Sequence, residues 1–263
     1  MVLSYNLTNQ LIKMRTRVTK GTRGQPEQSR KAILDAASVE FSNAGYDGAR
    51  IDAIAKSAKV NKALLYYYFH DKEALYGAVL DDNFRGLLEE LIRILDTDKS
   101  EGYKMLAYAL THFDYVTAHP HYRRLVQHEM MRAGAGNSVH FPRLVETFFR
   151  PLLRRVVQTI EEGIKRGEFR RVQPMHFVNS MIAVVVFYFT AVPVIQAVSG
   201  RDPLSAEALA VRREAMLDFV GGALFASDAD CANVLARVLA ENPQRSLPAS
   251  APALKRSVRG RKK

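Results

Sequence analysis

The fold of this chain is decided by residues 50–72, which read RIDAIAKSAKVNKALLYYYFHDK. Apolar side chains recur at helical spacing from Ile51 to Ala58, and the pattern is then interrupted at residues 59–61. Asn61 is a favourable N-cap residue, so a second short helix is expected to begin directly after it. The stretch therefore predicts two helices joined by a tight turn.

The second of these helices is expected to have two different faces. Leu65 and Phe69 are four residues apart, so they lie on one side of the helix and should point inward. A rotation of about 100° per residue places Ala63 and Tyr67 nearly opposite that pair. Three successive tyrosines cannot share one buried face, although the alternative that residues 66–68 are ordinary half-buried aromatic residues stays open.

A further helix is predicted upstream, from residue 26 to residue 44. Pro26 suits the first turn of a helix, where its missing N–H costs nothing. An apolar stripe runs from Ile33 to Ala44, and Gly45 then stands in the position that commonly ends a helix. A helix pair joined by a tight turn on such a three-helix core is a helix-turn-helix, whose second helix lies in the major groove of DNA.

The side chains of the predicted pair suit contact with DNA. Tyrosine hydroxyls and helix N-terminal amides reach phosphate oxygens, lysines add positive charge, and the small Ala63 allows close approach. Leu64 is placed to press on a thymine methyl group. The predicted DNA-contact residues are Arg23, Arg50, Asn61, Lys62, Ala63, Leu64, Tyr66, Tyr67, Tyr68 and Lys72.

The net charge of +11 is concentrated at the two ends of the chain. Residues 1–31 carry seven basic residues and one acidic residue, and the segment after Glu241 carries seven basic residues and no acidic one. Such blocks contact a polyanion or stay solvated. The single Cys231 excludes a disulfide framework and a cysteine-cluster metal site, and it fits a reducing, cytoplasmic compartment.

Residues 58–73, AKVNKALLYYYFHDKE, closely resemble the DNA-binding domain of TetR/AcrR-family transcriptional regulators. The resemblance is strong over residues 28–80 and architectural beyond them. It implies phosphate contacts by Tyr66, Tyr67 and Lys72, and a homodimer formed by the last two long helices. It also implies a small-molecule effector that binds in the helical body, moves the helix after Lys72 and spreads the two DNA-binding domains.

Three positions depart from the family pattern. Ala49-Arg50 stands where Thr-Thr or Thr-Ser is usual, so a hydroxyl cap is lost and Arg50 is left to supply the phosphate contact as a charge. Lys59 replaces the turn glycine, at a cost of about 1 kcal/mol if it keeps a left-handed conformation. Ala63 replaces a second glycine. These departures leave the docking surface in place, but they prevent a prediction of the operator sequence from the family pattern.

The rest of the chain is also predicted to be helical, which makes the fold class all-α. Residues 175–198 are long and apolar enough to suggest a membrane span, but polar residues interrupt them. We therefore expect a helix that is buried on all sides. A kink is expected at Arg150-Pro151, and Asp202 is expected to cap the last long helix. The predicted helices cover residues 72–95, 101–118, 120–132, 139–166, 175–198, 204–226 and 228–240.

The predicted domains follow from this pattern. They are a basic arm over residues 1–25, a helix-turn-helix domain over 26–72, an effector-binding and dimerisation domain over 73–241 and a basic tail over 242–263. The residues proposed for the pocket wall, each of which also suits a plain core position, are Phe113, Tyr122, Met130, Phe148, Phe149, Phe177 and Tyr188. Five histidines between residues 112 and 140 lack the spacing typical of a metal site, so no metal is predicted.

These features predict a sequence-specific regulator of transcription, a repressor that a small-molecule effector releases from a palindromic operator. The alternative is an effector-independent protein that coats or shapes DNA through its two basic ends. No phosphate-binding glycine loop, GxSxG or HExxH motif occurs, so neither an enzyme nor a cofactor is predicted. The expected partners are double-stranded DNA, a second copy through residues 175–198 and 204–226, and an effector, without a membrane.

Overall fold

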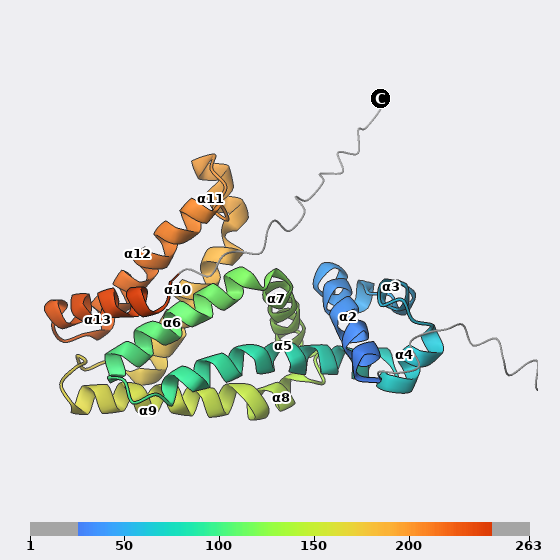
Figure 1. Cartoon of the computed structure of the whole chain (residues 1–263), viewed down its shortest axis with the longest axis horizontal. Coiled ribbons are helices and arrows are strands. Elements are labelled where there is room, and N and C mark those ends of the chain that lie inside the picture. Colours follow the sequence, from blue (N-terminus) through green and yellow to red (C-terminus); the bar gives the residue numbers. More distant parts are fainter. Residues whose placement is uncertain (1–25, 244–263) are drawn as a thin grey trace, which may run out of the picture. The chain divides into compact units, whose positions relative to one another are not determined.

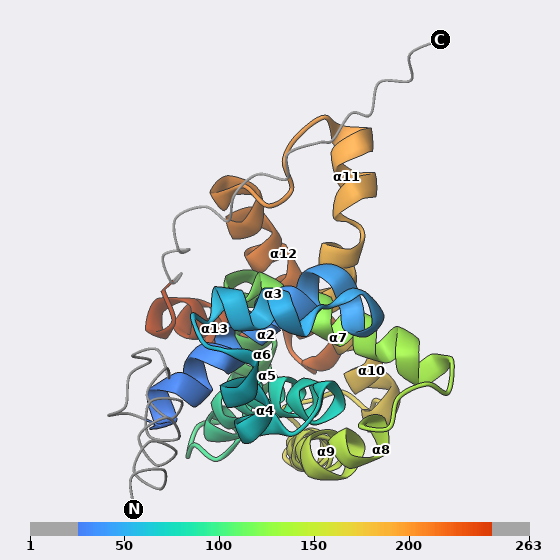
Figure 2. The same ribbon diagram turned by 90° about the vertical axis from the view of Figure 1, so that its right-hand side faces the viewer.

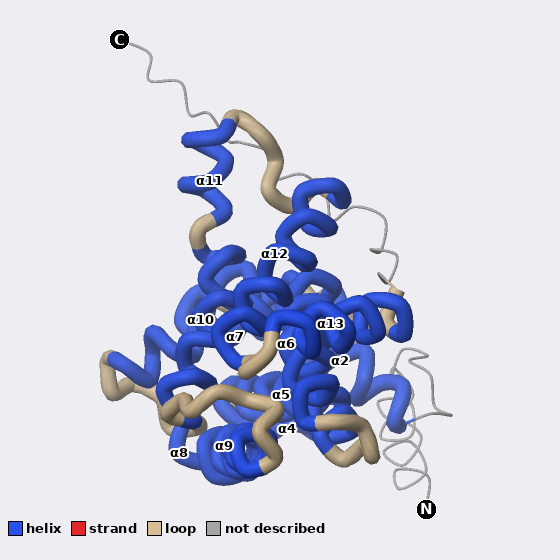
Figure 3. Tube along the Cα trace, turned by 90° about the vertical axis from the view of Figure 1, so that its left-hand side faces the viewer, coloured by secondary structure: helices blue, strands red, loops and turns tan. Residues whose placement is uncertain are grey.

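The computed structural model describes residues 26–243, and these residues form an all-α fold, as predicted. Helices and connecting loops account for the whole described segment in Figure 3. The only pairing of extended backbone among them is an isolated antiparallel bridge between Phe169 and Phe225. The helices divide into two compact units, whose described parts are residues 26–80 with 124–128 and residues 81–123 with 129–243.

The first unit is built on α2 (Pro26–Gly48), α3 (Ile51–Ser57) and α4 (Lys62–Phe69), which can be followed in Figure 2. The start of α5 (Lys72–Leu95) and the middle of α7 (Pro120–Gly134) complete it. Each of the three helices packs against the other two. The core of this unit includes the fully buried side chains of Ile33, Phe41, Ile54 and Leu65, with Phe69 also buried, as the apolar spacing predicts.

The helix predicted to end at residue 44 is broken at the expected place but continues for one more turn. Gly45 has φ 68° and ψ −179°, a conformation that no helix contains, and α2 resumes after it to Gly48. The Ala49 amide then donates to the Gly45 carbonyl over 3.2 Å. The break turns the chain toward α3, and the imidazole of His128 lies 3.5 Å from where a Cβ of residue 45 would stand.

The second unit is arranged around α6 (Glu101–Ala118), which packs against four other helices (Figure 1). These are α9 (Arg150–Lys165), α10 (Pro174–Thr190), α12 (Ala206–Leu224) and α13 (Asp228–Glu241). The buried Arg213 of α12 holds this packing with a salt bridge to Asp114 of α6, Nε to Oδ1 3.0 Å, and it also donates to the Asn242 carbonyl at the end of α13.

Two of the predicted helix boundaries need correction. Residues 141–165 form α8 (Phe141–Leu144), a π-helical turn (Val145–Phe149) and α9, so a π-type turn comes just before Arg150-Pro151, where a kink was expected. The last long helix begins later than predicted, because Ser205 and not Asp202 is its N-cap, with the Ser205 hydroxyl accepting from the Ala208 amide over 3.2 Å.

The prediction of one helix buried on all sides at residues 175–198 is wrong for the single chain. The segment is split into α10 and α11 (Val192–Ser199), which meet at a bend of 61°. Only one stripe of α10 is buried, and α11 has no buried residue. In Figures 1 and 3, α11 and the start of α12 extend away from the other helices of this unit. Within residues 26–243, no single helix is long and apolar enough to cross a bilayer. Of the helices in that range, only α10 and α11 taken together, as a bent pair, have the length and apolar composition for it.

We expect Gly45→Ala to lower the free energy of unfolding of the first unit by about 1–3 kcal/mol, because its backbone conformation is open essentially to glycine alone. Denaturant unfolding followed by circular dichroism measures the change. The matched control is Gly134→Ala, at a helical glycine with an ordinary φ and nothing within 4 Å of its added Cβ. Equal stability of the two variants would contradict the expectation.

Candidate nucleic-acid interface

The start of α4 is fixed by a side-chain cap. Asn61 has extended backbone angles, φ −82° and ψ 159°, and its side-chain oxygen accepts a hydrogen bond from the Leu64 amide over 2.8 Å. This is the N-cap that the sequence predicts, and such caps contribute about 1 kcal/mol. The cap sets where α4 begins, and the burial of Leu65 and Phe69 sets which side of the helix faces inward.

The outward face of α4 is small and aromatic, as predicted. Tyr67 is 80% exposed and Tyr66 is 44% exposed, and the neighbouring Ala63 is exposed as well. Leu64 and Tyr68 are half-buried, and the Tyr68 ring meets the Tyr67 ring edge-on at a centroid distance of 5.3 Å. Two tyrosine rings and an alanine methyl group therefore lie on a helix surface that its own chain leaves open.

The turn before α4 contains a left-handed residue at the expected position. Lys59 has φ 56°, a region in which a side chain with a Cβ is disfavoured by about 1 kcal/mol or more. The Val60 amide closes the end of α3 by donating to the Ala55 carbonyl over 3.0 Å. This turn allows α3 and α4 to pack against each other, which a helix-turn-helix requires.

Arg50 and Lys72 flank this pair of helices. Arg50 is exposed at the N-cap of α3, where its amide donates to Glu40 over 3.1 Å and its side chain forms no cap. Lys72 is half-buried, its ammonium donating to the Asp47 carbonyl over 3.3 Å and lying 4.9 Å from the centre of the Tyr46 ring. Arg23, which was predicted with them, lies outside the described residues.

One charged contact on this surface was not anticipated from the sequence. The Lys62 ammonium at the first residue of α4 lies 2.6 Å from a carboxylate oxygen of Asp52 in the first turn of α3. The pKa of Lys62 is raised, first by its hydrogen bond to Asp52 and then by the charge of that carboxylate. No periodic signal marks Asp52, because the contact depends on how the turn brings two helices together.

Comparison with known proteins shows which family the chain resembles. Residues 33–79 match the family described as bacterial regulatory proteins of the tetR family, and residues 104–220 match a tetracyclin repressor-like C-terminal domain. The HTH-type transcriptional repressor SCO4008 of Streptomyces coelicolor is 34% identical over 145 residues, covering 54% of this chain and 68% of the relative. The regulator RutR of Escherichia coli K12 is 31% identical over 189 residues, 69% of this chain and 84% of the relative.

The chain belongs to the TetR family. It is a helix-turn-helix regulator of transcription and not an enzyme. Among solved structures, the transcriptional regulator of hemolysin II, HlyIIR, is similar with a TM-score of 0.55 and 26% identity, over 73% of this chain and 98% of that one. Within this TetR-family fold, α4 is the second helix of the helix-turn-helix.

The residues predicted to line an effector pocket do not form one wall. The rings of Tyr122, Phe148 and Phe149 gather around Phe84 of α5, with ring centroids 5.2–6.0 Å apart. Phe113 and Tyr188 meet separately, at 6.5 Å. Met130 is exposed and Phe177 is half-buried, and neither belongs to these ring pairs.

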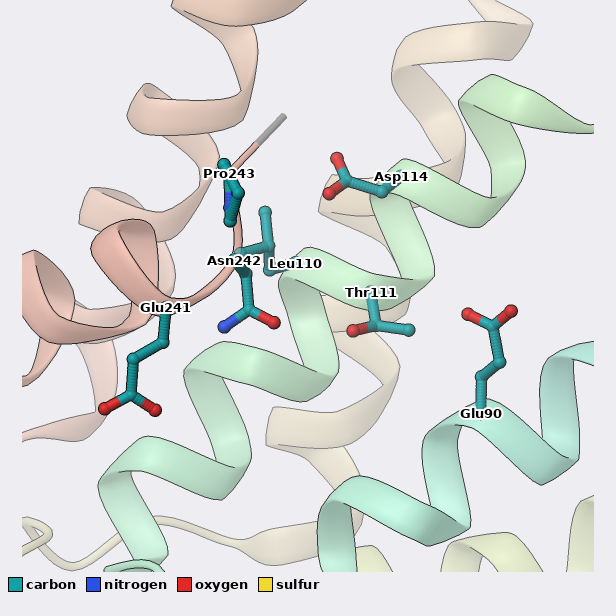
Figure 4. A pocket seen from close by; sticks show the side chains of 7 residues that line it. All are labelled: Glu90, Leu110, Thr111, Asp114, Glu241, Asn242 and Pro243. Carbon is teal, nitrogen blue, oxygen red and sulfur yellow. The ribbon is translucent and has the colours of Figure 1, made fainter. Parts of the chain in front are cut away.

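A pocket of about 250 Å³ lies elsewhere in the second unit, and sequence reasoning did not find it (Figure 4). It is lined by Glu90, Leu110, Thr111, Asp114, Glu241, Asn242 and Pro243. Its carboxylates are engaged by neighbours: Asp114 pairs with Arg213, and hydrogen bonds from Arg237, Lys99 and Tyr103 lower the pKa of Glu241 to about 2. Among the described residues, no group of three His, Cys, Asp or Glu side chains is placed to hold a metal ion.

Proposed function

We propose that this TetR-family protein is a repressor that binds a palindromic operator as a homodimer and leaves it when a small molecule binds. The observation that carries the proposal is the outward face of α4. Ala63, Tyr66 and Tyr67 are exposed on this face, and the Asn61 side chain caps the start of the helix. The name of the relative SCO4008, a transcriptional repressor, supports the negative sign of the regulation. Because bacterial DNA lies in the cytoplasm, the proposal places the protein there.

In the proposed complex, α4 enters the major groove and its flanks hold the DNA backbone. Tyr66, Tyr67, Arg50 and Lys72 contact phosphates, which position the protein without reading sequence. Ala63 and Leu64 are the nearest side chains to the bases, with the neighbouring Asn61, Lys62 and Tyr68 on the rim of the contact. The basic Arg23 would add charge from the arm. This assignment makes residues 26–72 the DNA-binding domain.

A second copy of the chain is the proposed partner of α10, α11 and α12. These helices carry large apolar side chains that their own chain leaves 60–83% exposed: Phe187, Val194, Val198, Val211 and Phe219. Large exposed apolar side chains on neighbouring elements are typical of an interface that a second copy covers. A twofold dimer also suits a palindromic operator, since two copies of α4 must then sit about one helical turn of DNA or a multiple apart.

The proposed effector site is the ring cluster around Phe84 in residues 73–241. Phe148 and Phe149 both contact Phe84 and both lie on the π-type turn, and such turns occur frequently at functional sites. Phe84 lies on α5, and α5 begins in the first unit and ends in the second. An apolar molecule inserted among these rings would shift α5 and thereby the DNA-binding helices.

The first test is a comparison of affinities for DNA. We expect the protein to bind DNA from upstream of its own gene about a thousandfold more tightly than random DNA of equal length. Fluorescence anisotropy at several salt concentrations measures both, and footprinting then locates the operator. Equal affinity for the two would contradict a repressor and favour a protein that coats DNA through its basic ends.

Lys72→Ala is expected to weaken binding to operator and random DNA alike. It should reduce the slope of log affinity against log salt by about one for each half-site, because one phosphate contact is lost. Arg150→Ala, which removes an exposed arginine paired with Glu146 in the second unit, is the charge-matched control. A slope equal to that of the wild type would mean that Lys72 does not contact phosphate.

Phe219→Glu is expected to dissociate the dimer, because a buried, unpaired carboxylate costs several kcal/mol in each copy. Sedimentation should show mostly monomer at concentrations where the wild type is dimeric, and operator affinity should fall. Val139→Glu is the control, because Val139 is as exposed but lies in the loop before α8. Dissociation by both variants, or by neither, would refute the proposed interface.

A further inference from the structure

The helix-turn-helix carries an acidic side chain on the surface that the proposed function turns toward DNA. Asp52 is 60% exposed in the first turn of α3, and its carboxylate contacts the Lys62 ammonium, which is 54% exposed, at 2.6 Å. Lys62 is the first residue of α4, next to the Asn61 cap. A carboxylate at this point would repel DNA phosphates, so its presence there needs an explanation.

The neighbours of this pair are the residues that would hold a phosphate. The pKa of Lys62 is raised mainly by Asp52, with a further rise from Tyr66 and an opposing effect of Arg50, so each of these three groups lies within electrostatic reach of Lys62. Lys62, Arg50 and Tyr66 together could bind one phosphate through two cations and a hydroxyl. Asp52 is the one carboxylate among these groups, and it already forms a salt bridge with the Lys62 ammonium.

The ion pair also suits the geometry of the free protein. A lysine at the first residue of a helix stands at the positive end of its dipole, which disfavours a cation. The carboxylate of Asp52 offsets this and holds the long lysine side chain in one direction. Exposed pairs of this kind contribute little to stability, so the pair is weakly held and can exchange partners.

We propose that Asp52 is a specificity-determining residue, which competes with DNA phosphates for Lys62 and thereby weakens binding to non-operator DNA more than binding to the operator. The inference rests on the proposed DNA-binding function of α4. Binding to random DNA draws almost entirely on phosphate charge, so it loses one effective lysine per copy.

On the operator two effects of Asp52 oppose each other. Its charge repels the nearby phosphates, but its contact with Lys62 orders the first turn of α4 before Ala63 and Leu64 meet the bases. Ordering a group before binding reduces the cost of binding. Asp52 therefore lowers affinity for random DNA while leaving operator affinity nearly unchanged, which widens the ratio between them.

The test is Asp52→Asn, measured by anisotropy on random DNA and on the footprinted operator near 0.1 M salt. We expect about threefold to tenfold tighter binding to random DNA, because both copies of a dimer gain a free lysine, and less than a twofold change on the operator. The gain on random DNA should shrink in 0.5 M salt as charges are screened. Asp52→Glu, which keeps the charge, should behave like the wild type.

Asp35→Asn is the matched control. Asp35 is also 60% exposed in the first unit and also pairs with a lysine, Lys31, at 2.7 Å, but both lie on α2. This variant changes the net charge by the same amount and should change affinity for random DNA by less than twofold. If Asp35→Asn tightens binding as much as Asp52→Asn, the effect is one of overall charge and the inference is overturned.

A double-mutant comparison tests the mechanism through Lys62. In a Lys62→Gln background, Asp52→Asn should give less than half of its gain, because no ammonium remains to be released. Unchanged or weaker binding of Asp52→Asn to random DNA, with a wild-type melting temperature, would overturn the inference. The random-DNA measurement stands even if the wild type shows no operator preference, an outcome that would refute the proposed repressor but not the competition for Lys62.

Discussion

The burial of Leu65 and Phe69 determines how the rest of the DNA-binding surface is presented. Leu65 is fully buried and Phe69 nearly so, in a core that includes Phe41 and Ile54. Once one side of an eight-residue helix is held inward, helical geometry directs its remaining side chains outward. The Asn61 cap sets where the helix begins, and the left-handed Lys59 lies in the short turn between α3 and α4. A polar residue at position 65 would therefore destabilise the unit and misplace every contact on the opposite side.

The second unit depends on a different arrangement, in which α6 is buried among helices that come from distant parts of the sequence. The Arg213–Asp114 salt bridge joins α12 to α6, and the same guanidinium donates to the end of α13. Since both charges are paired and hydrogen-bonded, their burial is tolerated, whereas removing one partner would leave the other uncompensated. Around this ordered centre, α10, α11 and α12 keep apolar side chains exposed, which a single copy does not bury.

The two candidate ligand sites of this unit differ in chemistry. The rings around Phe84 are apolar and sit on α5 and the π-type turn, so a ligand there would act directly on the helix shared by both units. In the pocket lined by Glu90, Asp114 and Glu241, the last two carboxylates are paired with arginine and lysine, and these pairs contribute to packing α6 against α12 and α13. The apolar cluster is therefore the site that we propose for the effector, and the acidic pocket contains structural salt bridges.

The sequence by itself determined the features that depend on neighbouring residues. Helical spacing predicted the helices from residue 26 to residue 118 and the outward tyrosines of α4. The residue type of Asn61 predicted its role as a cap. Each of these features follows from contacts within about one helical turn. Only the tertiary structure shows the Asp52–Lys62 contact, the bend between α10 and α11 and the pocket formed by α5, α6 and α13. These depend on how separate helices meet, and on which apolar faces find a partner, which no local spacing encodes.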